Sequence, residues 1–289
     1  MKAPSAILLV LLLAGCAAGG PGRPVLSPAD RDTLDRTAEA HQHDSPVATP
    51  AATTPPVGAV DGRSVVYAEV EGKPVTGYLA RPAGSRGPLP GLIVIHEWWG
   101  LNDNVRAEAR RLAAEGYVVL AVDLYAGEVA TEVPVALKLS QQLTANRAPG
   151  EANLRAAYEF LERVEKAPRI GTIGWCLGGG WSLRAAILLP TRVDATVIYY
   201  GNVRAGATEL APLKMPVLGL FAGNDRVVPA ASVAEFQATM ERLGKDVEVH
   251  VYPDAQHAFA NPSGTAYQAA AAEDAWRRTT AFLREHLVR

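Results

Sequence analysis

The segment that decides the fold runs from Ile170 to Gly180 and reads Ile-Gly-Thr-Ile-Gly-Trp-Cys-Leu-Gly-Gly-Gly. Its first half has the composition of a buried strand, and its last glycines lead into a helix. Gly174 and Gly178 flank Cys176, and their missing Cβ atoms permit a turn too tight for larger residues. The segment therefore predicts a strand that turns sharply into a helix, with Cys176 at the turn.

Cys176 would lie beside the start of this helix, predicted from Gly179 onward, where partial positive charge favours the thiolate. The backbone N–H of Leu177 is expected to point into the same pocket and to stabilise an oxyanion. The arrangement resembles the nucleophile elbow of the α/β-hydrolases, with cysteine in the position that serine usually takes. A buried cysteine in a glycine-rich packing turn is the alternative interpretation.

Residues 61–289 alternate short apolar segments with amphipathic ones. Strands are predicted at 92–95, 117–122, 170–175, 195–199, 217–222 and 247–252, and further helices at 102–115, 151–164, 230–243 and 267–287. Such alternation predicts a single α/β domain of the α/β-hydrolase type, a mostly parallel sheet with helices on both faces. Ligands of such sheets bind beyond the carboxyl ends of the strands.

Two polar residues follow later strands at exactly this edge of the predicted sheet. Asp225 comes after the strand 217–222, and His257 comes after the strand 247–252. A nucleophile needs a base and an orienting acid, which α/β-hydrolases carry in the chain order nucleophile, acid, histidine. We therefore predict that Asp225 orients His257 and that His257 serves as the base for Cys176.

Rival assignments remain at this point. Asp254 is too close to His257 along the chain to be the usual partner, and Asp123 has the position of a structural turn residue. His257 could itself be a hydrogen-bonding loop residue. The other histidines fit the base less well, because they lie in the N-terminal segment, before the acid, inside a strand or at the C-terminus: His41, His43, His96, His250 and His286.

Four stretches together carry a resemblance to a known family: His96-Glu97-Trp98-Trp99-Gly100-Leu101-Asn102, Asp123-Leu124-Tyr125, Gly174-Trp175-Cys176-Leu177-Gly178-Gly179 and His257-Ala258-Phe259. Through them, nearly all of residues 61–289 resembles the dienelactone hydrolases (carboxymethylenebutenolidases). The resemblance implies a Cys-His-Asp triad at Cys176, His257 and Asp225 that cleaves ester or lactone bonds through an acyl-enzyme. It implies no metal or organic cofactor.

The resemblance also assigns roles around the triad. Glu97 is expected to help ionise the thiol when substrate arrives, and the backbone N–H of Trp98 to be the second oxyanion donor beside that of Leu177. Trp99 and Phe259 are expected in the substrate pocket, Trp99 as a wall or alternatively as core packing. Glu97 could alternatively be a salt-bridged or solvent-facing loop carboxylate.

The sequence departs from the family where the carboxylate of a lactone substrate would be bound by arginines. Asn261 stands four residues after His257, where the family has arginine, and is expected in the pocket instead. The segment 131–143 offers only Lys138 for the second arginine. Without a bidentate arginine clamp, recognition of a small dianionic ligand is not predicted.

The N-terminus resembles a lipoprotein signal peptide. Residues 1–15 combine a positive start, a short apolar run and small residues before Cys16, which predicts export, cleavage before Cys16 and lipidation of its thiol. The protein is thus expected on the bacterial cell envelope, held to a membrane by lipid. An ordinary signal peptide with an incidental cysteine is the alternative.

Residues 16–60 are rich in Ala, Gly, Pro and Thr and are predicted to be an extended tether. A helical patch is expected within 27–40, because Ser27-Pro28 has the pattern of an N-cap followed by proline. His41 and His43 are interpreted as solvated linker histidines rather than metal ligands.

The composition excludes several classes of function. The 289 residues are 48% hydrophobic with a net charge of −2, which gives no basic surface for nucleic acid. The only cysteines, Cys16 and Cys176, cannot form a disulfide framework or a thiolate-rich metal site. Two other functions stay open: a catalytically quiet binding protein on the cell envelope, and a redox role for Cys176, which no nearby cysteine supports. The oligomeric state is not predicted.

Overall fold

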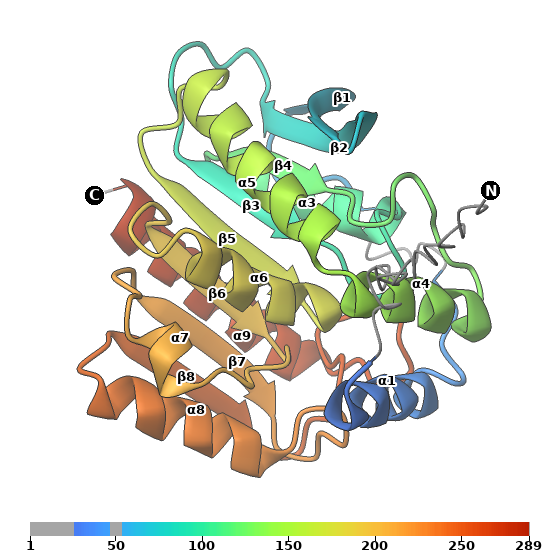
Figure 1. The fold of residues 1–289 in the computed structure, drawn as a ribbon. Helices are drawn as coiled ribbons and strands as arrows, with labels where there is room; N and C mark the ends of the chain where they lie inside the picture. Colours follow the sequence, from blue (N-terminus) through green and yellow to red (C-terminus); the bar gives the residue numbers. More distant parts are fainter. Residues whose placement is uncertain (1–25, 47–53, 289) are drawn as a thin grey trace, which may run out of the picture.

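The computed structural model describes residues 26–46 and 54–288, and its centre is an eight-stranded sheet in the order β1-β2-β4-β3-β5-β6-β7-β8 (Figure 1). Strands β3 to β8 run parallel, whereas β2 is antiparallel to both β1 and β4. The strand bounds are β1 Val60–Val70, β2 Lys73–Pro82, β3 Gly91–Ile95, β4 Val118–Val122, β5 Ile170–Trp175, β6 Ala195–Tyr199, β7 Val217–Ala222 and β8 Val247–Tyr252.

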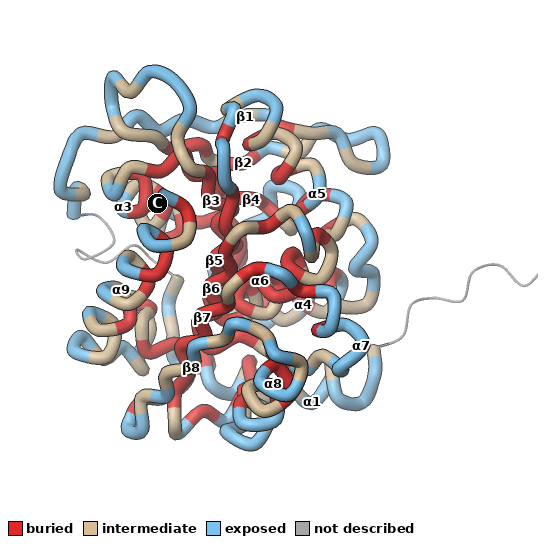
Figure 2. The backbone as a smooth tube through the Cα atoms, turned by 90° about the vertical axis from the view of Figure 1, so that its left-hand side faces the viewer, coloured by how far each residue is buried: buried red, intermediate tan, exposed pale blue. Residues whose placement is uncertain are grey.

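Helices cover both faces of this sheet, as predicted, and Figure 2 shows the buried strands as a layer between them. Alternate residues of one strand serve opposite faces: Ile93 packs into one apolar cluster, and Leu92 and Val94 pack into the other. The helix bounds are α3 Asp103–Ala114 and α9 Ala269–Leu283 on one face, α5 Ala148–Arg163, α6 Leu177–Leu188 and α8 Ala230–Arg242 on the other, with α4 Val133–Ala145, α7 Ala207–Leu210 and the π-helix η1 Arg284–Val288.

The six predicted strands and five predicted helices all form, with ends that shift by up to four residues. The hairpin β1–β2 and the helix α4 were not predicted. Much of β1 faces solvent, so its sequence lacks the apolar run that marks the central strands. The helix predicted at 151–164 ends one residue earlier, at Arg163, and Val164 beyond it is 62% exposed.

The helical patch expected near the N-terminus forms as α1, Pro28–Ala40. Ser27 caps it, accepting a hydrogen bond from the backbone N–H of Asp30 at 3.0 Å. The helix lies beside α4 below the carboxyl edge of the sheet (Figure 1) and buries Leu34 and Thr37 there. This part of the predicted tether is therefore folded onto the domain rather than extended.

The predicted signal peptide and Cys16 lie outside the described residues. Within 26–46 and 54–288, no helix has the length and apolar character needed to cross a bilayer.

Candidate active site

The turn at Cys176 is as tight as its glycines predict. β5 ends at Trp175 and α6 begins at Leu177, so Cys176 alone makes the turn, with φ 54° and ψ −117°. A Cβ atom on Gly174 would meet the carbonyl oxygen of Gly178 at 2.1 Å. A Cβ atom on Gly178 would meet the carbonyl oxygen of Ile95 at 2.2 Å. Both glycines are thus required sterically, and the helix starts two residues earlier than expected.

We expect Gly178→Ala to lower the free energy of unfolding by about 1–3 kcal/mol, since the clash is with backbone that cannot rotate away. Urea denaturation measures this change. Gly206→Ala is the matched control, because no atom lies within 4 Å of the added Cβ there and its φ of −77° suits alanine. Equal stability of the two variants would contradict the steric argument.

Cys176, His257 and Asp225 converge at the carboxyl edge of the sheet, from the ends of β5, β8 and β7. The Nε2 atom of His257 lies 3.1 Å from the Sγ atom of Cys176, and its Nδ1 atom lies 2.8 Å from Oδ2 of Asp225. All three side chains are buried. Residues 81 positions apart along the chain are therefore within hydrogen-bonding distance, as the strand topology predicts.

The carboxylate of Asp225 is held in one orientation. Its Oδ1 atom accepts hydrogen bonds from the backbone N–H groups of Val227 and Val228, at 2.7 and 2.8 Å. Its Oδ2 atom is thereby free to accept a hydrogen bond from Nδ1 of His257. The ring of Tyr200 packs edge-on against the imidazole at 5.3 Å and fixes its plane from the side. The histidine is thus fixed both by hydrogen bonding and by packing.

The electrostatics of the group favour a thiolate beside an imidazolium. Burial alone would raise the pKa of Cys176, but the charge and hydrogen bond of His257 outweigh it and lower this pKa to about 6. Burial would lower the pKa of His257, yet Asp225 and Cys176 raise it well above its usual range. The sulfur is therefore prepared as a nucleophile at neutral pH.

Glu97 lies next to this group and is held by its neighbours rather than by a salt bridge. Its Oε2 atom accepts a hydrogen bond from Nδ2 of Asn261 at 2.6 Å, and its Oε1 atom lies 3.5 Å from the hydroxyl of Tyr200. Burial and the neighbouring charge of Cys176 raise the pKa of Glu97 to about 8. The carboxyl group is consequently protonated at neutral pH and can give up a proton when its surroundings change.

The rival residues have structural roles. His96 accepts a hydrogen bond from the backbone N–H of Leu124 through Nε2, at 3.1 Å. Asp123 accepts hydrogen bonds from the backbone N–H groups of Tyr125 and Gly127, as expected of a turn residue. Asp254 is exposed. None of these three competes for the contacts that Asp225 and His257 make.

His41 corrects the sequence interpretation. It was expected in a solvated linker, but it is only 1% exposed, because α1 folds onto the domain and places it beside Cys176 and His257. Its Nδ1 atom lies 2.6 Å from Oδ2 of Asp44, and its ring centroid lies 5.6 Å from that of His257. Burial would lower the pKa of His41, but the hydrogen bond with Asp44 helps raise it to about 9. His43, two residues on, is exposed as expected.

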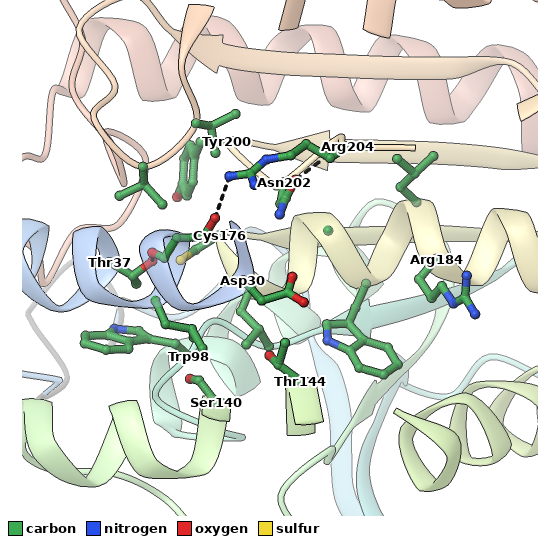
Figure 3. Close-up of a pocket in the computed structure, with 18 of the residues that line it drawn as sticks. Asp30, Thr37, Trp98, Ser140, Thr144, Cys176, Arg184, Tyr200, Asn202 and Arg204 are labelled. Carbon is green, nitrogen blue, oxygen red and sulfur yellow. Dashed lines mark hydrogen bonds between the residues drawn. The ribbon is translucent and has the colours of Figure 1, made fainter. Parts of the chain in front are cut away.

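A cavity of about 400 Å³ opens in front of the sulfur (Figure 3). Trp98 and Leu177, the two predicted oxyanion donors, line it together with Cys176 and His257. Its remaining walls come from α1, α4, α6 and the loops after β6 and β7. The other residues expected in the substrate pocket are buried but are not among the described residues that line this cavity: Trp99, Phe259 and Asn261.

Three arginines line the cavity from elements that the sequence interpretation did not consider. Arg147 forms a salt bridge with Asp30 of α1, and Arg184 is paired with Glu151 and Glu209. Arg204 instead donates to uncharged groups of α1, a carbonyl and a hydroxyl. Guanidinium groups therefore line the same cavity as Cys176, although not at the positions the family resemblance implies.

Comparisons with known proteins identify the family of this chain. The sequence model of the dienelactone hydrolase family matches residues 75–287. A protein of Saccharolobus solfataricus with the provisional name carboxymethylenebutenolidase is 32% identical over 256 residues, covering 76% of this chain and 97% of that protein. Protein usf of Aquifex pyrophilus is 34% identical over 230 residues, covering 77% of this chain and 98% of that protein.

A solved structure of a dienelactone hydrolase-like protein has the same fold. The dienelactone hydrolase-like promiscuous phosphotriesterase P91, from metagenomic libraries, is 26% identical, with a TM-score of 0.73 over 79% of this chain and 99% of that one. The predicted fold class is confirmed by this likeness and by the sheet topology. By sequence and by structure, the chain belongs to the dienelactone hydrolase family of α/β-hydrolases.

Proposed function

We propose that this hydrolase cleaves esters or lactones through a covalent acyl-enzyme on Cys176, with His257 as acid and base and Asp225 as the orienting group. One observation carries the proposal: the unbroken series of contacts from Sγ to Nε2 at 3.1 Å and from Nδ1 to Oδ2 at 2.8 Å. This is the relation between nucleophile, base and orienting acid that acyl transfer requires.

The reaction follows from these contacts. The thiolate of Cys176 attacks the carbonyl carbon, a C–S bond forms, and the carbonyl oxygen takes up negative charge. The backbone N–H groups of Leu177 and Trp98 are proposed to bind this oxyanion. His257 passes its proton to the leaving oxygen as the C–O bond breaks. It then takes a proton from water, which attacks the thioester and frees the acid and the thiolate.

The cavity suggests a substrate of modest size. A space of about 400 Å³ is adequate for a small ester or lactone in front of the sulfur. Arg204 makes no ion pair among the described residues, so it is the guanidinium best placed to meet an anionic group of the substrate. We propose that Glu97 assists ionisation of the thiol through its charge state: the buried carboxyl group is protonated at rest, so it does not repel the negative sulfur of Cys176.

The proposal is tested by a panel of activated esters, lactones and thioesters offered to the purified full chain. We expect hydrolysis of several small members, with a burst of the first product equal to the concentration of enzyme. A lactone with and without a carboxylate, compared in wild type and Arg204→Gln, reports on anion recognition. Absence of hydrolysis across the panel, with a folded protein, would contradict the proposal.

We also propose that the protein is exported and anchored by lipid on Cys16. The support is the order of residues 1–16, with small residues directly before the cysteine. We expect wild type to incorporate labelled fatty acid and to sediment with membranes, and Cys16→Ala to do neither. A Cys16→Ala variant that still takes up the label would contradict the anchor.

A further inference from the structure

Two imidazoles, not one, face the sulfur of Cys176. His257 comes from the domain that the family match covers, whereas His41 comes from the segment after α1, before the matched residues begin at 75. One ring nitrogen of each histidine and the sulfur of Cys176 all lie within 4.8 Å of one another, and all three residues are buried. The second imidazole is a property of this chain rather than of the matched family region.

The hydrogen bonds of the two imidazoles decide which nitrogen faces the sulfur. Nδ1 of His257 is bonded to Asp225, and Nδ1 of His41 is bonded to Asp44. A carboxylate at Nδ1 keeps a proton on that nitrogen, so Nε2 is the atom of each ring that offers a lone pair once the imidazolium has lost its other proton. The Asp44 carboxylate is itself fixed, because it accepts hydrogen bonds from the backbone N–H and the hydroxyl of Thr265, each at 2.7 Å.

Nε2 of His41 is an orphan in this arrangement. It is buried and makes no well-formed hydrogen bond with any of the described residues, and its interaction is with the nearby sulfur of Cys176, which helps raise the pKa of His41. A buried polar atom without a partner costs free energy, and its presence in a site calls for a ligand. Hydrolysis as proposed above uses His257 as its acid and base, so His41 helps to lower the pKa of Cys176 but takes no part in proton transfer.

We propose that His41, Cys176 and His257 bind a thiophilic divalent cation, Zn²⁺. Two imidazoles and one thiolate are a donor set that zinc prefers, and it leaves a fourth position open toward the cavity. Zinc bonds of about 2.3 Å to sulfur and about 2.0 Å to nitrogen place tetrahedral ligand atoms roughly 3.5 Å apart. The 3.1 Å between Sγ and Nε2 of His257 needs to open only slightly to match.

The outer ligand sphere strengthens this inference. Histidines that bind zinc commonly pass their other N–H to a carboxylate, which fixes the ring and makes it a better ligand. Both histidines here have that partner already in place. Binding would release two protons to solvent, the one on Nε2 of His41 and the one that Cys176 and His257 share, because zinc takes the thiolate and two neutral imidazoles as ligands.

Zinc and catalysis would exclude one another. A cation on the sulfur takes the electron pair that attacks the carbonyl, and on His257 it takes the lone pair that accepts a proton. Zinc binding is therefore expected to switch the proposed hydrolase off reversibly, and chelation to restore it. The inference uses the residues of the proposed function, but binding requires no turnover and is measured separately from it.

Calorimetric titration of the full chain, first freed of metal by chelator, tests the proposal with Zn²⁺ itself. We expect one ion per chain in wild type, with an affinity at least tenfold lower in His41→Ala and in His41→Gln, which keeps more of the side-chain volume. His43→Ala is the matched control and should bind as wild type, since His43 is exposed two residues away. Circular dichroism of each variant checks that it is folded.

Titration with Co²⁺ identifies the sulfur ligand. We expect a thiolate-to-metal charge-transfer band in the near ultraviolet, absent in Cys176→Ala. Unchanged zinc affinity in both His41 variants, or no such band in wild type, would overturn the proposal. A chain that binds zinc as described but cleaves no ester would overturn the proposed function alone.

Discussion

Cys176→Ala is expected to lose hydrolysis of activated esters by about a thousandfold or more, because the sulfur of Cys176 is the atom that lies within hydrogen-bonding distance of Nε2 of His257, the proposed base. The residual rate would come from the oxyanion donors and from binding, which the substitution leaves in place. Alanine occupies less space than cysteine and meets the same backbone strain at φ 54°, so the fold should persist. Steady-state kinetics with one reactive ester, on wild type and variant, measure the loss.

The other cysteine supplies the control for this substitution. Cys16 lies in the predicted lipidation sequence, far along the chain from the elbow, and Cys16→Ala should hydrolyse the same ester at the wild-type rate. A thermal unfolding curve shows whether Cys176→Ala is folded. Wild-type activity in folded Cys176→Ala would rule out the sulfur as nucleophile.

Asp225→Asn is expected to reduce turnover by about a thousandfold, because it favours the wrong tautomer of His257. Two backbone N–H groups, those of Val227 and Val228, hold one oxygen of residue 225. The amide oxygen of asparagine would stay with these donors and leave its NH₂ group facing Nδ1. Nδ1 must then accept, so the proton moves to Nε2, and the imidazole can no longer take one from the thiol or from water.

Asp254→Asn is the matched control for this effect, since it makes the same chemical change on an exposed loop residue near His257. Its rate should equal that of wild type. The rate of Cys176 alkylation should fall in Asp225→Asn as well, because the thiolate loses its imidazolium partner. A normal rate of turnover in Asp225→Asn would show that His257 is oriented by something else.

The sequence predicts the centre of this fold well, for a physical reason. Strands such as β5 and β7 are buried on both faces, so nearly every residue must be apolar or small, and the pattern is visible locally. The tight turn at Cys176 can also be predicted from the local sequence. Glycine is needed at 174 and 178 because a Cβ atom there would clash with backbone a few residues away or with backbone at the end of the adjacent strand. The positions of Asp225 and His257 then follow, because the carboxyl ends of parallel strands lie at the same edge of the sheet.

What the sequence does not reveal depends on contacts between distant segments. β1 is largely exposed or half-buried, so its sequence has no apolar run, and it forms a strand because it pairs with β2. His41 lies in a stretch of linker-like composition, and its burial arises from packing against Trp98, at a ring distance of 5.0 Å. The capping residue Ser27 indicated the helix, but no local signal indicated where that helix would lie.

The pocket residues show the same limit. Trp99 packs against Trp98 and His41. Phe259 packs against Tyr200, and Asn261 donates a hydrogen bond to Glu97. Both residues therefore contact side chains that lie beside Cys176 and His257. The resemblance placed these side chains near the chemistry, but the described cavity is lined instead by helices whose approach depends on the tertiary fold. Their expected contact with substrate stays a prediction.

The central claim is that the sulfur of Cys176 carries the acyl group during turnover. Mass spectrometry of the full chain, quenched with acid while it turns over a slowly deacylated ester, tests this most directly. We predict a mass increase equal to one acyl group, located on the peptide that contains Cys176 and absent in Cys176→Ala. An acyl group on a different residue of the active protein would contradict the account.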